Sequence, residues 1–170
     1  MLIHLTGEVN PEMLEKLIEG YNKLEYISVE KQEIMTIYFA SGGGDNSSTS
    51  AIIQLINSNK DKTILYAYDK ILSNGFKIFY EIECKKDLIE DIVGMYHLTV
   101  HPGLIHYEGG KDKDDYNKFA KIGMKNYYYL DKVHSIVNFT DKELEDIKDH
   151  KDTWFNYKRL KSMLKYNIRK

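Results

Sequence analysis

The chain has few of the residues on which several common kinds of site depend. Of its 170 residues, one is cysteine, two are proline and two are arginine. Because Cys84 is alone, no intrachain disulfide and no thiolate zinc site can form within one chain. With arginine limited to Arg159 and Arg169, the bidentate recognition of phosphates and bases by guanidinium groups has little support.

The chain also lacks an excess of positive charge and any long apolar run. Its 24 basic and 26 acidic residues give a net charge of -2, which argues against a nucleic-acid partner held by bulk electrostatics. No apolar run approaches the length of a membrane span, so no membrane partner is expected. Residues 1–6 lack the basic and long apolar regions of a secretory signal. We therefore expect a cytoplasmic protein.

What the sequence does contain is an alternation of strand and helix patterns. Three segments are apolar or β-prone, as strands are: residues 2–5, 34–40 and 63–68. Each is followed by apolar residues at helical spacing, and Asn10 with Pro11 opens the first of these helices. Residues 45–50 supply capping residues for the second, and residues 73–75 lead into the third. This alternation predicts an α/β fold with parallel strands joined by right-handed crossovers.

The pattern changes past residue 85. Residues 88–100 are apolar and β-branched enough for one or two strands, with Gly94 as the expected bend. The apolar positions from about Asp114 to Val137 predict a long helix. We therefore expect the C-terminal third of the chain to be helical.

Helix signals continue to the end of the chain. Thr140 and Glu143 have the spacing of a capping box, and Asn156 begins a last amphipathic segment. No internal repeat or linker separates the parts, so residues 1–170 are expected to form one domain. Its expected parts are an α/β core over residues 1–105, a helix over 111–137 and a helical C-terminal segment over 138–170.

The first candidate for chemistry is the glycine-rich segment 41–44, Ser-Gly-Gly-Gly, between a predicted strand and a predicted helix. Backbone N–H groups in such a turn can bind an anion or stabilise a tetrahedral oxyanion. The segment matches neither of the two glycine-rich nucleotide motifs, so we expect no nucleotide or other cofactor. A tight turn that needs glycine for its positive φ explains it equally well.

The second candidate is Ser73, which stands where a strand should pass into a helix. A serine at such a turn can present its hydroxyl as a nucleophile at the N-terminus of the helix. The small residues Asn74 and Gly75 follow it. Serine is also a preferred N-cap residue, and capping alone would account for its place.

Imidazole and carboxylate groups complete the candidate set. His97, His101 and His106 are close in sequence, but their spacing does not fit the H-E-x-x-H zinc motif, and no thiolate joins them. A single histidine acting as the base for Ser73 is a simpler interpretation. Asp152 precedes the aromatic pair at residues 154–155, a setting that could bury it in part, although most acids are surface charges.

Taken in order, these pieces resemble the Clp protease proteolytic subunit, a serine peptidase of the ClpP/crotonase fold. The likeness begins with the strand that ends in Thr-Gly-Glu-Val at residues 6–9. Residues 37–44 are similar to the family strand that ends in Asn-Ser-Pro-Gly-Gly, and residues 72–76 to its nucleophile motif Ala-Ser-Met-Gly-Ala. Residues 95–99 are similar to the family's Met-Ile-His-Gln-Pro, and residues 151–155 lie where its acid is found. The likeness covers residues 1–105 well and the rest loosely.

The resemblance implies a fold of repeated β-β-α/β-α units with a helical C-terminal third. It implies a catalytic triad of Ser73, His97 and Asp152, with the backbone N–H groups of Gly43 and Asn74 as the oxyanion hole. Two assignments stay open. His101 is the alternative base, one turn downstream, and three nearby acids are alternatives to Asp152: Asp141, Asp146 and Asp149.

The function that the resemblance implies is a ClpP-like serine endopeptidase acting on peptides or unfolded protein, of the short divergent type encoded by phages. The family forms rings, so a homo-oligomer assembled through the helix over residues 111–137 is expected, with a separate ATPase as a possible partner. An inactive ClpP-like assembly component is the first alternative. An acyl-CoA-processing member of the wider crotonase fold is the second.

Overall fold

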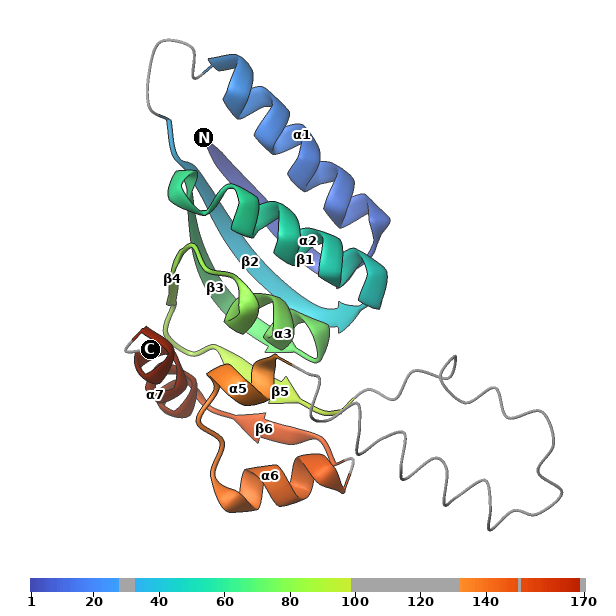
Figure 1. Cartoon of the computed structure of the whole chain (residues 1–170), viewed down its shortest axis with the longest axis vertical. Coiled ribbons are helices and arrows are strands. Elements are labelled where there is room, and N and C mark those ends of the chain that lie inside the picture. The colour runs from blue at the N-terminus through green and yellow to red at the C-terminus, as the bar shows by residue number, and fades with distance from the viewer. Residues whose placement is uncertain (28–32, 99–131, 150, 169–170) are drawn as a thin grey trace, which may run out of the picture.

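The computed structural model describes residues 1–27, 33–98, 132–149 and 151–168 (Figure 1). The expected α/β class is confirmed: six strands form one sheet in which most strands run parallel. The first half of the chain alternates strand and helix as predicted. Its elements are β1 (Leu2–Val9), α1 (Pro11–Ile27), β2 (Met35–Gly44), α2 (Asn46–Ser58), β3 (Thr63–Leu72) and α3 (Asn74–Glu81), with a short 3-10 turn at Lys60–Lys62.

The first two helices begin where the sequence indicates. The Asn10 side chain accepts a hydrogen bond from the N–H of Met13 at 2.9 Å, with Pro11 as the first residue of α1. Asp45 caps α2 by accepting from the N–H of Ser48 at 2.6 Å. Both side chains satisfy N–H groups that have no partner within the helix.

Two strands follow α3, but the first begins earlier than predicted. They are β4 (Lys85–Leu88) and β5 (Val93–Tyr96), and each pairs in parallel with a different part of β3. Gly94 lies inside β5, so the expectation of a bend there is wrong. A Cβ at Gly94 would lie 2.6 Å from Cδ2 of Leu160, and the glycine therefore lets a C-terminal helix approach the strand.

The C-terminal part contains α5 (Val133–Ile136), α6 (Asp141–Lys148), β6 (Thr153–Phe155) and α7 (Tyr157–Ile168). The capping box is confirmed, because Thr140 and Glu143 exchange side-chain and backbone hydrogen bonds at the start of α6. The strand β6, which pairs antiparallel with β5, was not predicted. Residues 111–131 of the expected long helix lie outside the described residues.

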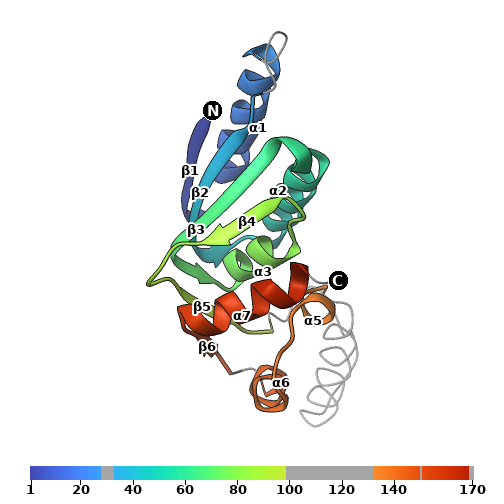
Figure 2. The same ribbon diagram turned by 90° about the vertical axis from the view of Figure 1, so that its left-hand side faces the viewer.

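The layers explain how the core forms. Figures 1 and 2 show α1, α2 and α3 on one face of the sheet, whose strand order is β1-β2-β3-β5-β6 with β4 also beside β3. The side chains between these layers are fully buried, among them Leu5, Ile37, Phe39, Leu65, Phe76 and Phe79. The helix α7 contacts β4 and β5, and its Leu160 carbonyl accepts from the Tyr80 hydroxyl of α3 at 3.0 Å. Within the described ranges, no helix combines the length and the apolar character needed to cross a membrane.

Candidate active site

Strand pairing brings the segments of Ser73 and His97 together. Leu72, the last residue of β3, is paired with Met95 of β5, and the N–H of Ser73 donates to the Met95 carbonyl at 2.8 Å. Because β3 and β5 are parallel, the residues that follow them lie at the same edge of the sheet. The segments that carry Ser73 and His97 therefore lie side by side, although the two residues are 24 positions apart in the sequence.

The next strand pair brings Asp152 to the same edge. In the antiparallel pairing of β5 with β6, Tyr96 lies opposite Thr153, so the residues just beyond them, His97 and Asp152, also face each other. Nδ1 of His97 is 3.3 Å from Oδ1 of Asp152, and 3.4 Å from Sδ of Met95. The His97 side chain is 30% exposed and that of Asp152 is 59% exposed, so Asp152 is an acid of the surface, as most acids are.

The other acids considered for this role have different surroundings. Asp146 and Asp149 both bind the ammonium of Lys151, at 3.1 and 3.2 Å. Asp141 is the first residue of α6, which the Thr140 capping box holds. Among these four acids, Asp152 is the one in contact with His97.

Ser73 has a strained backbone at the turn from β3 into α3. Its φ and ψ are 52° and -119°, a combination that residues with a Cβ rarely adopt. It occupies the N-cap position of α3, but its side chain makes no capping hydrogen bond, so the N-cap interpretation does not explain the residue. Such strain costs on the order of 1–3 kcal/mol and is found mainly at functional sites.

The glycine-rich end of β2 lies directly against this serine. A Cβ added to Gly43 would be 2.8 Å from Cβ of Ser73 and 3.3 Å from the nitrogen of Asn74. A Cβ at Gly75 would meet the Ser41 carbonyl at 2.9 Å. The two segments therefore touch through positions where only glycine fits, and Gly43, at φ 98°, also has the positive φ that favours glycine.

The two predicted oxyanion donors differ in their present partners. The N–H of Asn74 belongs to the first turn of α3, where the helix offers no carbonyl to bind it. The N–H of Gly43 donates to Oγ of Ser41 at 3.1 Å, and that hydroxyl donates to the Gly7 carbonyl at 2.8 Å. For Gly43 to stabilise an oxyanion, its N–H would thus have to break the hydrogen bond to Oγ of Ser41.

No hydrogen bond joins the Ser73 hydroxyl to the His97 ring within the part of the chain that the structure describes. The geometry pairs His97 with Asp152 and sets Ser73 against Gly43 and Asn74, which gives two halves of a site at one edge. Triads without substrate often have long or misaligned hydrogen bonds, and they tighten when substrate binds. The arrangement can support acyl transfer once the hydroxyl and the imidazole approach each other.

Sequence reasoning missed two side chains at this edge. One is Ser41, whose hydroxyl holds the glycine-rich turn to β1. The other is the Asn74 amide, which donates to the Gly44 carbonyl at 2.6 Å and to Oδ1 of Asn46 at 2.8 Å. Serine and asparagine in loops are too common for their type alone to indicate such contacts.

Two of the histidines considered for a metal site, His101 and His106, lie outside the described residues. Among the residues that are described, no group of three or more histidine, cysteine or acidic side chains could hold a metal ion. His101 as the alternative base therefore stays a prediction, as does the oligomer contact over residues 111–137.

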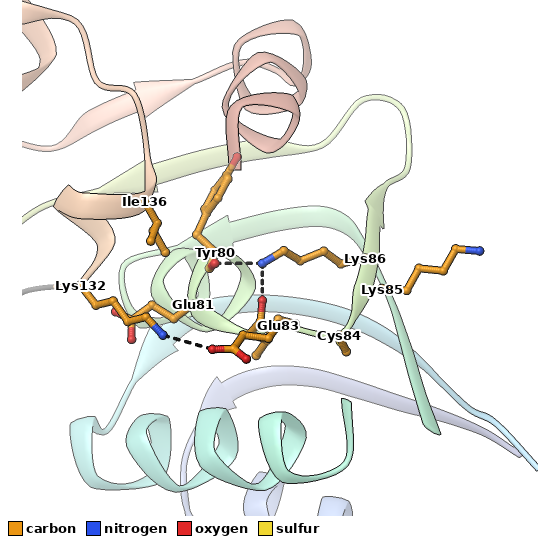
Figure 3. Close-up of a pocket in the computed structure, with 9 residues that line it drawn as sticks. Tyr80, Glu81, Glu83, Cys84, Lys85, Lys86, Lys132 and Ile136 are labelled. Carbon is orange, nitrogen blue, oxygen red and sulfur yellow. Dashed lines mark hydrogen bonds and ion pairs between the residues drawn. The ribbon is translucent and has the colours of Figure 1, made fainter. Parts of the chain in front are cut away.

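A pocket lies at the opposite end of α3 from Ser73 (Figure 3). This pocket of about 590 Å³ is lined by Tyr80, Glu81, Ile82, Glu83, Cys84, Lys85, Lys86, Lys132 and Ile136. Lys86 donates to the carbonyls of Tyr80 at 2.8 Å and Ile82 at 2.5 Å, so it caps the C-terminus of the helix. Burial lowers the pKa of Lys86 to about 7 and raises the pKa of Cys84 to about 11. The cysteine is therefore a protonated thiol at neutral pH, which makes it a poor nucleophile.

Comparison with known proteins relates this fold to one group of structures. No protein-family model matches the sequence, and no curated protein matches it. Among solved structures, a mutant of ClpP1 from Listeria monocytogenes superposes with a TM-score of 0.64 over 98% of this chain and 87% of that chain. The two sequences are 18% identical. The chain therefore has a ClpP-like fold, as its sequence resemblance led us to expect.

Proposed function

We propose that the protein is a ClpP-like serine endopeptidase with Ser73 as its nucleophile, His97 as its base and Asp152 as the acid that orients the base. The observation that carries this proposal is the strained Ser73, which lies between the end of β3 and the start of α3 and leaves its hydroxyl without a capping role. The pair formed by His97 and Asp152 at the next strand end supports it further.

The proposed reaction begins with proton transfer from Ser73 Oγ to Nε2 of His97 as the oxygen attacks the peptide carbonyl. The resulting oxyanion accepts hydrogen bonds from the N–H of Asn74 and, once it has left Ser41, from that of Gly43. His97 then protonates the departing amine, which leaves an ester on Ser73. Water, deprotonated by His97, hydrolyses this ester and restores the serine.

Asp152 has two tasks in this scheme. As a carboxylate it accepts from Nδ1 of His97, which keeps the lone pair of the neutral imidazole on Nε2, facing away from Asp152. It also stabilises the imidazolium that forms when the serine proton is taken up. Because Asp152 is more than half exposed, we expect its contribution to be smaller than that of a buried acid.

The assembly belongs to the same proposal. A ClpP subunit is among the structural neighbours, so we propose a homo-oligomeric ring in the cytoplasm that admits peptides or unfolded segments. A separate ATPase that feeds the ring and a phage-type origin are further parts of the proposal. Light scattering on the purified protein tests this proposal, because a ring should have a molar mass that is a defined multiple of the mass of one chain.

Hydrolysis of fluorogenic peptides and of casein tests the activity. The wild type should cleave, while Ser73→Ala and His97→Ala should each lose at least about 10³-fold in rate. His101→Ala should keep most of the rate, which separates the two candidate bases. If His101→Ala is inactive and His97→Ala is active, the assignment of the base is wrong.

A second function, an inactive ClpP-like assembly component, is favoured by one observation. The N–H of Gly43 donates to Oγ of Ser41, so one of the two proposed oxyanion donors already has a partner. This alternative predicts a defined oligomer without measurable cleavage of any peptide. A cleavage rate that depends on Ser73 would eliminate it.

A further inference from the structure

We propose that the Asn74 side chain is a positioning residue that holds the glycine-rich turn in register with Ser73. The proposal rests on the proposed function, because what it positions is the oxyanion hole. It concerns the amide side chain of Asn74, whereas the hole itself would use the backbone N–H of the same residue. Asn74 is buried, with 5% of its surface exposed.

The amide is held in one orientation by its partners. Nδ2 of Asn74 lies 2.6 Å from the Gly44 carbonyl, which can only accept a hydrogen bond, so the NH₂ group must point there. The same nitrogen is 2.8 Å from Oδ1 of Asn46, the first residue of α2. One side chain thus uses both of its donors to join the start of α3 to the turn between β2 and α2.

The turn that Asn74 binds at the Gly44 carbonyl is also hydrogen-bonded to β1. The N–H of Asp45, in the same peptide unit as the Gly44 carbonyl, donates to the Val9 carbonyl at 2.7 Å. That peptide unit is therefore held by β1 at its N–H and by α3 at its carbonyl. These two hydrogen bonds fix the orientation of the Gly44–Asp45 peptide unit relative to Ser73. The neighbouring Gly43 peptide is thereby oriented relative to Ser73 as well.

This coupling matters because the two halves of the oxyanion hole come from different segments. Gly43 belongs to the end of β2 and Asn74 to the start of α3, and no covalent connection shorter than 30 residues links them. An error of about 1 Å in the placement of such groups can cost about 100-fold in rate. The Asn74 amide joins the two segments beside Ser73 directly to each other.

Asn74→Asp is the test variant, since it keeps the shape and replaces the donor with an oxygen that repels both acceptors. Its rate of phosphonylation at Ser73 by a fluorophosphonate should fall by about 10- to 100-fold. Affinity for a peptide boronate, which forms a tetrahedral adduct, should fall by a similar factor. Affinity for an uncleaved peptide, measured in the Ser73→Ala background, should change by less than about threefold, a split that general destabilisation would not produce.

The matched control is Asn57→Asp in α2, whose side chain contacts the far end of α3. Asn57 also makes two hydrogen bonds there, accepting from the Glu83 N–H at 2.7 Å and donating to the Glu81 carbonyl at 3.4 Å. We expect this variant to unfold at a lower temperature but to be phosphonylated at the wild-type rate. Thermal unfolding of both variants verifies that folded protein is compared.

The outcomes separate the two claims. A wild type that reacts while Asn74→Asp reacts within about threefold of it overturns the role of the Asn74 side chain alone. Equal slowing in Asn74→Asp and Asn57→Asp also overturns it, because the effect would then be general. A wild type that does not react at Ser73 overturns the proposed function, and the role of Asn74 in it falls as well.

Discussion

Nδ1 of His97 lies 3.3 Å from Oδ1 of Asp152, although 55 positions separate the two residues in the sequence. A short antiparallel pairing between β5 and β6 produces this contact. Since a carboxylate can only accept a hydrogen bond, the pairing favours the imidazole tautomer with its proton on Nδ1. The remaining nitrogen, Nε2, is then available to take a proton from a hydroxyl.

The first prediction concerns this pair. Asp152→Asn should lower the peptidase rate by at least about 100-fold, because an amide can donate to Nδ1 and favour the wrong tautomer. Peptide hydrolysis at neutral pH is the measurement. Asp149→Asn, at an acid that binds Lys151, is the matched control and should keep the wild-type rate. Equal rates for all three proteins would contradict a role for Asp152.

The second prediction uses the strained backbone of Ser73. Glycine adopts φ 52° and ψ -119° without a Cβ, so Ser73→Gly should be more stable than Ser73→Ala by about 1 kcal/mol. Urea unfolding measures the difference. At exposed Ser50 inside α2 the order should reverse, with the glycine variant less stable than the alanine variant by about 1 kcal/mol. The same order at both positions would argue against strain at Ser73.

The third prediction follows from Lys86, which is partly buried against the C-terminal end of α3. Its pKa is about 7 in the folded protein, chiefly because of burial, and about 10.5 when unfolded. Between these values the unfolded chain binds more protons, so this residue's contribution to stability increases as pH rises and is lost as pH falls toward 7. The wild type should therefore gain about 2 kcal/mol relative to Lys86→Met between pH 7 and pH 9.

Urea unfolding at several pH values from 7 to 9 measures this gain. The removal of two hydrogen bonds to the carbonyls of Tyr80 and Ile82 adds an offset that does not depend on pH. Lys85→Met, on the exposed neighbouring side chain, is the control for the loss of a positive charge. A stability difference between wild type and Lys86→Met that stays constant with pH would contradict the account.

The fourth prediction concerns the ion pair that joins α6 to α7. Arg159 donates to both carboxylate oxygens of Glu143, at 2.8 and 2.6 Å. Burial alone would raise the pKa of Glu143, but the hydrogen bonds from Arg159 and Thr140 outweigh it and leave the pKa below its usual value. Glu143→Gln should therefore cost about 2 kcal/mol at pH 7.

The stability difference between wild type and Glu143→Gln should depend on pH. A carboxyl group with a lowered folded pKa contributes stability above its unfolded pKa and loses it as pH falls through the folded value. The gap between wild type and Glu143→Gln should thus narrow below about pH 4.5. Glu19→Gln, in an exposed pair with Lys23, should change stability by less than about 0.5 kcal/mol. A gap that widens in acid would show that the charge of Glu143 is not stabilising.

Local signals predicted much of the fold. Asn10 and Asp45 cap helices because their side chains bind N–H groups three residues away, and the Thr140 capping box works over the same distance. Alternation of apolar segments predicted the parallel strands, since each buried strand needs a helix on the face of the sheet. These features depend on residues that are close in sequence.

The missed features depend on residues that are far apart. The strand β6 has three residues and forms by pairing with the edge of β5. No local sequence pattern predicts this pairing. Gly94 in the sequence alone suggests a bend, whereas in the structure it leaves room for the Leu160 side chain. The Asn74 amide likewise donates a hydrogen bond to the carbonyl of Gly44, 30 positions earlier, which the local sequence does not indicate. The candidate residues of the site were accessible from the order of the motifs, whereas the contacts that hold them were not.

The central claim is that Ser73 is an activated nucleophile, and covalent labelling tests it most directly. The folded wild type, incubated with a fluorophosphonate, should gain one adduct by intact mass, and peptide mapping should locate it on Ser73. The Ser73→Ala protein should gain none, and His97→Ala should react far more slowly because the hydroxyl has lost its base. Folded wild-type protein that gains no adduct, or gains it at another residue, would contradict the account.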